Sequence, residues 1–291
     1  MKNLTKLFLA VAVLFAGFAC TTDATEDLGV NVGGQSTLCL SLEESRTELG
    51  EKAEDVYPLK WSEGDQIAVN GAVSSALKAE QAGGAGAEFA FDAVLTRPLS
   101  IIYPASAEAG MVTFLGNQEY KVGTFAPGAA PMYGYATEVA EGEEATPIQM
   151  KHLTGVLRFA VKGEVSLASA VITSDNGDLA GTYAVNCATG ALTAQEGLTS
   201  KQITLSFGEG LALNTAEATP FYVTVPAGQY GAMQVRLITT DGKNMVVKFS
   251  SYGDKAIKAG TVREFGEFDF VENAISADEA GVFEIYTYED L

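Results

Sequence analysis

Residues 36–42, Ser-Thr-Leu-Cys-Leu-Ser-Leu, place a leucine at every second position without a break. Successive side chains of a β-strand point to opposite faces, so Leu38, Leu40 and Leu42 fall on one face. The stretch therefore predicts a strand with one buried face. After residue 20, no segment of ten or more residues shows the 3.6-residue repeat of a helix. The sequence predicts an all-β protein.

Further strand-like runs follow, separated by turn signals such as Asn70-Gly71. They lie at residues 88–94, 99–103, 111–115, 118–122, 155–162, 168–173, 181–185, 202–207, 220–225, 232–240, 244–250 and 261–271. Short strands with a turn every 8–12 residues or so are typical of β-sandwiches of about 100 residues each. The chain of 291 residues therefore accommodates two such domains.

The domain boundary is expected near Lys151, where the regular second series of strands begins. Residues 124–147, just before it, are rich in Gly, Pro, Ala and Glu and predict a long loop. We therefore predict one β-sandwich at residues 36–150 and a second at 151–271. Residues 272–291 are predicted to be an acidic linker followed by a β-prone terminal segment.

The N-terminus predicts export. Lys2 and Lys6 precede a 13-residue apolar run at residues 7–19, which ends at Cys20. This pattern is typical of a secretory signal peptide, and the run is shorter than the roughly 20 residues that span a bilayer as a helix. Gly17-Phe18-Ala19-Cys20 is similar to the lipobox of bacterial lipoproteins, in which the cysteine is acylated and becomes the new N-terminus. Plain secretion with an incidental cysteine is the alternative.

The polar, non-periodic residues after the predicted cut indicate a flexible tether. We therefore assign residues 1–19 to the signal peptide and 20–35 to a lipidated tether. Lipidation at Cys20 would anchor the protein in the outer membrane, because each buried CH₂ group contributes about 0.8 kcal/mol.

The charge balance excludes one class of partner. The chain has 37 acidic and 18 basic residues and a formal net charge of −19. Binding to nucleic acid requires clustered Lys and Arg side chains to neutralise phosphates, which this composition does not supply. Because the acidic residues are spread along the chain, they indicate solubility rather than an interaction tail.

The residue inventory argues against catalysis and metal binding. His152 is the only histidine, no nucleophile motif accompanies it, and we interpret it as a structural residue. One histidine and two dispersed cysteines after Cys20 do not make a zinc site, and residues 175–178 indicate a turn rather than a calcium loop. We predict a protein that is not an enzyme and that holds no metal or cofactor. A glycosidase-type carboxylate pair remains an alternative that sequence alone does not test.

The two later cysteines, Cys39 and Cys187, each sit among alternating apolar residues. Two buried free thiols are the favoured interpretation, and a disulfide between them is the alternative. Trp61, the only tryptophan, lies beside a predicted strand and is expected in the core. Five tyrosines keep a glycan-binding surface open as a further alternative, namely Tyr120, Tyr133, Tyr135, Tyr286 and Tyr288.

Several motifs together carry a family resemblance. They are W-S-E-G-D-Q-I-A-V at residues 61–69, I-Y-P-A at 102–105, K-H-L-T-G-V-L-R-F at 151–159, F-Y-V-T-V-P-A-G at 221–228 and A-G-T-V at 259–262. With the lipobox, their order and spacing resemble those of the fimbrillin-like lipoproteins, which include the subunits of type V pili of anaerobic gut and oral bacteria. The resemblance implies two transthyretin-like Greek-key β-sandwich domains in tandem after a lipoprotein signal peptide.

The resemblance also implies a mechanism. Type V pilins reach the outer membrane as lipoproteins, and a trypsin-like protease cuts after an arginine in the loop behind the first strand. Loss of that strand opens a groove, which a strand of the next subunit fills. Mapped onto this sequence, the first strand is residues 36–42 and the cut follows Arg46.

The arginines themselves give independent support for Arg46. Of the five in the chain, Arg97 precedes a proline, and Arg158, Arg236 and Arg263 lie in predicted strands. Arg46 alone lies in a long charged loop, at residues 43–55, where a protease can unfold the backbone locally. An uncut surface arginine remains an equal alternative.

The donor strand is expected at the C-terminus, at Val282, Phe283, Ile285, Tyr286 and Tyr288. The sequence therefore predicts a pilus subunit or pilus-associated adhesin on the cell surface or in the fimbrium, with other pilin subunits as partners. The alternative is a monomeric surface lipoprotein that binds a glycan or a host protein.

Overall fold

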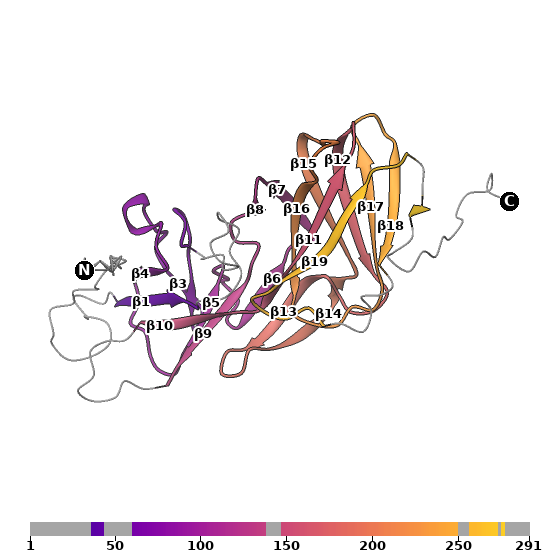
Figure 1. Ribbon diagram of the computed structural model, residues 1–291. Helices are drawn as coiled ribbons and strands as arrows, with labels where there is room; N and C mark the ends of the chain where they lie inside the picture. The colour runs from indigo at the N-terminus through magenta and orange to yellow at the C-terminus, as the bar shows by residue number, and fades with distance from the viewer. Residues whose placement is uncertain (1–35, 44–59, 138–146, 250–255, 273–274, 277–291) are drawn as a thin grey trace, which may run out of the picture.

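The computed structural model describes residues 36–43, 60–137, 147–249, 256–272 and 275–276. Within these residues the protein is built of β-strands, and its single helical turn is the three-residue 3₁₀ turn Ala79–Gln81. The all-β prediction is therefore confirmed. The strands form two lobes that lie side by side along the length of the molecule (Figure 1).

The first lobe contains one seven-stranded sheet, in the order β3-β2-β5-β9-β10-β1-β4. Its strands, in that order, are β3 (Ala72–Val73), β2 (Ala68–Val69), β5 (Leu99–Tyr103), β9 (Met132–Ala136), β10 (Ile148–His152), β1 (Ser36–Leu42) and β4 (Gly86–Phe91). The turn between β2 and β3 is the predicted Asn70-Gly71, and both residues have positive φ, 50° and 89°. These angles belong to the tight hairpin turn that this dipeptide favours.

The core of the first lobe, which we call the first core, gathers around Trp61, which is 2% exposed. The Trp61 ring makes edge-to-face contacts with Phe89 and Tyr103, at centroid distances of 5.0 and 5.4 Å. The expected core position of this tryptophan is confirmed. Its burial removes it as a glycan platform.

The second lobe contains three sheets. The first is β16 (Thr219–Pro226), β11 (Thr154–Lys162) and β19 (Val262–Asp269), in that order. The second is β20 (Ile275–Ser276), β18 (Asn244–Phe249), β17 (Met233–Thr239), β12 (Ser166–Ser174), β15 (Gln202–Ala212), β7 (Asn117–Lys121) and β8 (Thr124–Phe125). The third is β14 (Ala191–Ser200), β13 (Ala180–Asn186) and β6 (Met111–Phe114).

The second core lies between the first two of these sheets. β11 and β16 contribute Phe159 and Phe221, whose rings stack at 5.3 Å, and β15 and β18 contribute Phe207 and Phe249. Inner faces that interdigitate in this way are the arrangement of a β-sandwich. The transthyretin-like Greek-key order of two tandem domains stays a prediction.

Strands β6, β7 and β8 cross from one lobe to the other. In sequence they lie between β5 and β9, which are antiparallel neighbours in the first lobe. In space β6 pairs with β13, and β7 pairs in parallel with β15. The chain thus leaves the first lobe after Tyr103, adds strands to the second lobe, and returns at Met132.

A small apolar cluster lies where the lobes meet, and we call it the junction cluster. Its buried residues are Ile102, Val112, Phe114, Leu153, Tyr183 and Cys187. Ile102 belongs to β5, whereas Tyr183 belongs to β13, so both lobes contribute to it. The predicted domain limits at residues 150 and 151 fall within β10, and they stay a prediction.

Several strands were not predicted from the sequence, among them β8, β9, β10 and β14. β8 and β9 lie inside residues 124–147, which were predicted to be a loop, and this prediction is wrong for Thr124–Phe125 and Met132–Ala136. β9 shows why. The strand interior contains Gly134, where a Cβ atom would come within 2.9 Å of the Met150 sulfur. Close packing between strands therefore requires the glycine that the sequence presents as a loop signal. β14 was missed because its residues are mostly exposed, without an apolar alternation.

Candidate functional site

Most of the predicted site residues lie outside the described residues. This applies to the lipidation site Cys20, to the cleavage site Arg46 and to the donor residues Val282, Phe283, Ile285, Tyr286 and Tyr288. These assignments stay predictions. The structure does describe the strand that the predicted cut would release, together with its surroundings.

That strand, β1, spans Ser36–Leu42, the range predicted from the sequence. It lies between two other strands of the first lobe. On one side Leu40 to Leu42 pair in parallel with Ile148 to Met150 of β10. On the other side Ser36 to Ser41 pair antiparallel with β4. Since β4 borders only β1 in this sheet, β1 is the strand through which β4 is joined to the rest of the sheet.

One face of β1 is buried in the first core. Leu38, Leu40 and Leu42 are 4%, 1% and 6% exposed, and the residues between them are half-buried. Burying a leucine side chain contributes about 1.5–3 kcal/mol, so the three together contribute roughly 5–9 kcal/mol. This is comparable with the whole stability of an ordinary domain, about 5–15 kcal/mol. A first lobe without β1 therefore requires another strand in its place.

The surroundings of β1 form what we call the β1 groove: the inner edges of β4 and β10 and the core side chains beneath. Buried Phe91, Phe89 and Ala87 of β4 lie opposite Ser36, Leu38 and Leu40. Buried Met150 of β10 lies opposite Leu42. At one end of the strand, the Leu95 backbone N–H donates to Ser36 Oγ at 3.3 Å. At the other end, the Leu42 N–H donates to the Ala85 carbonyl at 2.9 Å.

A hydrogen-bond network beside the first core connects the sequence motifs at residues 61–69 and 102–105. The Asp65 carboxylate accepts hydrogen bonds from the Ser62 N–H at 2.7 Å and from the Tyr103 hydroxyl at 2.8 Å. The Gly128 N–H donates to the same hydroxyl at 3.2 Å. Desolvation raises the pKa of Asp65, although both of its hydrogen bonds lower it. The network fixes the W-S-E-G-D turn against β5, and sequence reasoning identified the motifs without this contact.

The cysteines correct a prediction. Cys187 is a free buried thiol, as predicted, so no bridge joins it to Cys39. Its Sγ lies 3.8 Å from the Ile101 carbonyl. Cys39, on the outward face of β1, is half-buried, so the prediction that both cysteines are buried is wrong for Cys39. The side chain faces away from the core because the leucines occupy the inward positions.

Three of the four described arginines lie in strands. Arg158, Arg236 and Arg263 lie in β11, β17 and β19, as predicted. Arg158 also pairs with Glu264 at 2.6 Å. Backbone held in a sheet does not fit a protease cleft without local unfolding. These three sites are therefore protected by the fold.

His152 is buried at the end of β10. Its side chain is 8% exposed, and desolvation lowers its pKa to about 4, so the imidazole is neutral at pH 7. This fits the interpretation of a structural histidine. Within the described residues, no group of three or more His, Cys, Asp or Glu side chains is placed to hold a metal ion. No helix in the same part of the chain is long and apolar enough to cross a membrane.

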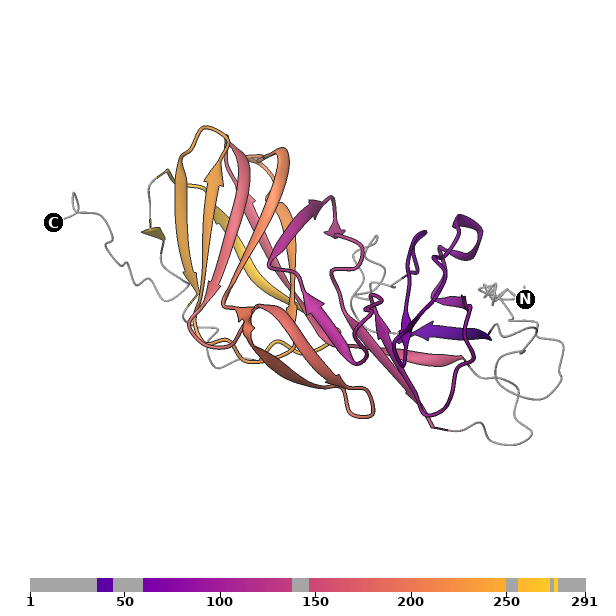
Figure 2. The ribbon, with the colours of Figure 1, turned by 180° about the vertical axis from the view of Figure 1, so that it is seen from behind.

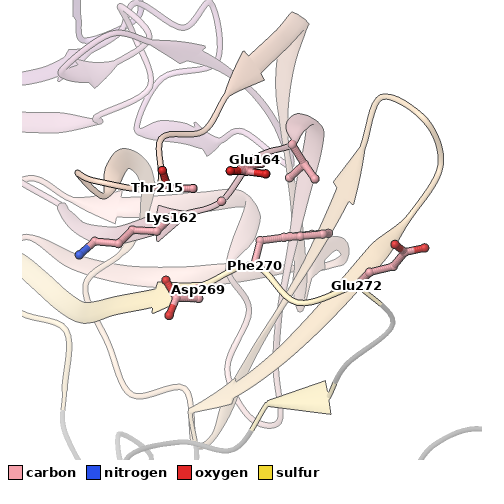
Figure 3. A pocket seen from close by; sticks show the side chains of 8 residues that line it. Lys162, Glu164, Thr215, Asp269, Phe270 and Glu272 are labelled. Carbon is pink, nitrogen blue, oxygen red and sulfur yellow. The ribbon is translucent and has the colours of Figure 1, made fainter.

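An open hollow of about 410 Å³ lies where β11 and β19 end (Figure 3). Phe270 lies at its centre, and the carboxylates of Glu164, Asp269 and Glu272 point apart from one another around it. The charges pair with neighbours instead: Lys162 with Glu267 at 3.6 Å, and Glu272 with Lys243 at 2.8 Å. The arrangement has no convergent polar groups that would recognise a ligand.

The tyrosines give little support to a glycan platform. Among the three described candidates, Tyr120 and Tyr133 are half-buried, and Tyr120 packs edge-to-face on Phe207 at 5.5 Å. Tyr135 is 38% exposed. Tyr286 and Tyr288 lie outside the described residues.

Comparison with known proteins gives matches only among solved structures. No protein-family model and no curated protein matches the sequence. A "putative cell adhesion protein" from Bacteroides uniformis has 15% identity and a TM-score of 0.44, covering 84% of this chain and 95% of its own. A second from Bacteroides ovatus has 12% identity and a TM-score of 0.45, covering 72% and 83%. A fimbrial assembly protein from Parabacteroides distasonis has 13% identity and a TM-score of 0.35, covering 79% and 90%. The names of these three structures describe adhesion and fimbrial assembly proteins.

Proposed function

We propose that this protein is a fimbrillin-like pilus subunit or pilus-associated adhesin, assembled by exchange of its first strand. It is not an enzyme. The observation that carries the proposal is the placement of β1, a strand that fills a groove in the first lobe and precedes every other described residue. Its removal breaks no hairpin, because neither of its neighbours, β4 and β10, is joined to it by a short turn.

A cut after Arg46 releases the lipid anchor and the strand together. Cys20 and β1 both precede Arg46 in the sequence, so one cleavage separates them from the two lobes. The exported precursor is then a monomer held at the outer membrane by its acylated cysteine, and the cut chain is free to join the fimbrium. The free thiol of Cys187 supports this step, because no disulfide ties β1 to the second lobe.

The shape of the molecule supports assembly in a line. β1 lies at one end of the molecule, and β20, the last described element, lies at the opposite end (Figure 2). A groove at one end, together with a donor segment that follows β20 in the sequence, would give a head-to-tail contact. Contacts of this kind generate open filaments when the rotation between subunits does not close a ring. The partners are therefore further pilin subunits, joined by β-augmentation.

The test uses the purified full chain and an arginine-specific trypsin-like protease. Mass spectrometry should show release of the residues up to Arg46, and gel filtration should show multimers that persist in SDS. The variant Arg46→Ala should remain uncut and monomeric under the same conditions. A cut chain that has lost β1 and stays a stable monomer at every concentration would rule out strand exchange.

A further inference from the structure

Part of the chain between two first-lobe strands completes the second lobe. We call residues 104–131, which run from β5 to β9, the crossing segment. In the third sheet of the second lobe, Met111 to Phe114 of β6 pair antiparallel with β13, and Val112 and Phe114 are 2% and 1% exposed. In the second sheet, β7 pairs in parallel with β15. Two of the three sheets of the second lobe therefore depend on a segment whose two ends lie in the first lobe.

The returning end of the crossing segment is bonded to the place where the chain passes between the lobes again. The Pro131 carbonyl, one residue before β9, accepts hydrogen bonds from the Leu153 N–H and from Thr154 Oγ1, both at 3.0 Å. Leu153 and Thr154 lie where the chain passes from β10 to β11, and each is 2% exposed. The Leu153 carbonyl in turn accepts from the Ala227 N–H at 2.9 Å, just after β16. These hydrogen bonds join the start of β9 in the first lobe to β11 and β16 in the second.

A turn of the second lobe also packs onto the first lobe. It connects β13 to β14, and its Cys187, which is 5% exposed, places Sγ 3.8 Å from the Ile101 carbonyl of β5. At Gly190 of the same turn, which has a φ of 77°, an added Cβ atom would overlap the hydroxyl end of Tyr133 in β9. The glycine leaves the space that this side chain occupies. The turn therefore contacts both of the strands between which the crossing segment leaves the first lobe and returns.

We infer that the crossing segment is a rigid joint, which makes the two lobes one cooperative unit that unfolds as a whole. Domains in tandem ordinarily share an interface like that of a transient complex and move relative to each other. Here neither lobe opens alone, because the second would lose strands from two sheets and the first would lose the contacts that hold β5 and β9. The inference does not depend on strand exchange. In a filament, the same joint would carry tension from one lobe to the other.

The experiment is urea unfolding of the full chain, followed by Trp61 fluorescence and by far-UV circular dichroism. Trp61 is the only tryptophan and lies in the first core, so its emission reports on the first lobe. Circular dichroism reports on both lobes. In the unmodified chain the two transitions should coincide, as different probes do when one unit unfolds.

The main variant changes the second core at a distance from the joint. Leu237→Ala, at a position of β17 with 0% exposure, leaves a cavity that should lower the urea midpoint by about 1 M or more. Among the described strands, β17 pairs with β12 and β18, both in the second lobe. The Trp61 midpoint should nevertheless fall by the same amount. The matched control Leu198→Ala, at a position 60% exposed in β14, should shift both midpoints by less than about 0.2 M.

Further variants vary the size and the place of the change. Ile172→Val, in the second core, is milder and keeps the test usable if Leu237→Ala does not fold; it should lower both midpoints equally, by about 0.3 M. Phe114→Ala changes the joint itself, because the Phe114 ring contacts Tyr183 edge-to-face at 5.5 Å in the junction cluster. The far-UV transition should then become biphasic, with Trp61 following only one step. Phe249→Ala, in the second core, should instead lower both midpoints together.

Two results would overturn the inference. One is a far-UV midpoint that falls in Leu237→Ala while the Trp61 midpoint stays in place, and the other is separate transitions in the unmodified chain. Either would show that the lobes unfold independently. A single coincident transition in Phe114→Ala would overturn the assignment of the joint to the junction cluster.

Discussion

The two lobes differ in what pairs with the backbone at the edge of a sheet. In the first lobe the sheet runs through β1, a strand that one proteolytic cut is proposed to remove. In the second lobe a side chain forms hydrogen bonds with the backbone of the edge strand β16. The Gln118 amide donates to the Thr224 carbonyl at 2.8 Å and accepts from the Thr224 N–H at 3.0 Å, as a paired strand would. Under the proposed strand exchange, the first lobe exchanges a strand and the second stays closed.

The crossing strands attach the first lobe to the second. Gln118 belongs to β7, which the chain reaches from β5 of the first lobe. After the crossing, the Ala129 carbonyl accepts a hydrogen bond from Thr224 Oγ1 at 2.7 Å, and the chain then enters β9. Strands β5 and β9 are therefore held by the second lobe whether or not β1 is present. This comparison makes four predictions, given from the largest expected effect to the smallest.

Replacing Gln118 should destabilise the second lobe. In Gln118→Leu, the N–H and C=O of Thr224, which is fully buried, lose their partner. Each buried unsatisfied group costs about 1–3 kcal/mol, so the free energy of unfolding should fall by roughly 2–6 kcal/mol. Urea denaturation monitored by circular dichroism measures the loss. Gln149→Leu, at an exposed position of β10, is the control and should change stability by less than about 0.5 kcal/mol.

The buried leucine of β1 should matter only until the cut. Leu40→Ala should lower the free energy of unfolding of the intact chain by about 2–5 kcal/mol, because it leaves a cavity in the first core. After cleavage and separation of the fragment, the same substitution should have no effect. Leu157→Ala, in β11 of the second core, should destabilise both forms. An effect of Leu40→Ala that survives separation would mean that β1 does not leave.

The histidine at the end of β10 should make stability depend on pH. Desolvation lowers the pKa of His152 from 6.5 to about 4, so between these values the unfolded chain binds a proton that the folded chain does not. Stability is therefore lost as the pH falls from 6.5 to 4, by up to about 3 kcal/mol from this residue. His152→Gln should flatten the pH dependence of the urea midpoint in that window. An unchanged slope in the variant would show that His152 does not carry it.

Local pattern in the sequence predicted the strands that carry a clear apolar signal. β1 and β5 have the predicted ranges, since strict alternation or a short apolar run marks them. β14 was missed because exposed residues give no alternation. β9 was missed because Gly134 reflects contact with Met150, which is distant in sequence. Tertiary pairing, not local pattern, also decides that β6 and β7 join the second lobe.

In the candidate site, too, the sequence predicted local features but not contacts between distant residues. The alternation of residues 36–42 identified the strand and its inward leucines, because the pattern and the burial are both local. The opposition of Ser36 to Phe91 depends on a register between segments about fifty residues apart, which no local pattern encodes. The hydrogen bonds of Gln118 with Thr224 join positions still farther apart in the sequence, so no sequence motif predicted them.

The smallest effect is expected from Tyr103, in the part of the first lobe that the proposed cut leaves in place. Tyr103→Phe removes the hydroxyl that donates to Asp65 and accepts from the Gly128 N–H. A hydrogen bond to a charged group contributes about 1.5–3 kcal/mol, and we expect a loss of roughly 1–3 kcal/mol in the intact and the cut chain alike. Tyr135→Phe, whose ring is exposed on β9, is the matched control and should leave stability unchanged.

The pH dependence of the Tyr103→Phe loss separates this bond from simple packing. The pKa of Asp65 is already raised by desolvation, and removing a hydrogen-bond donor to its carboxylate raises it further. A folded carboxyl with a raised pKa loses stability as the pH rises through the interval between its unfolded and folded pKa values. The Tyr103→Phe loss should therefore be larger at pH 7 than at pH 4. Since Asp65 and Tyr103 border the core but do not pair with β1, the loss should be equal before and after cleavage. A loss seen only in the intact chain would mean that the wall of the groove folds with β1, and that the first lobe does not hold its shape for an incoming strand.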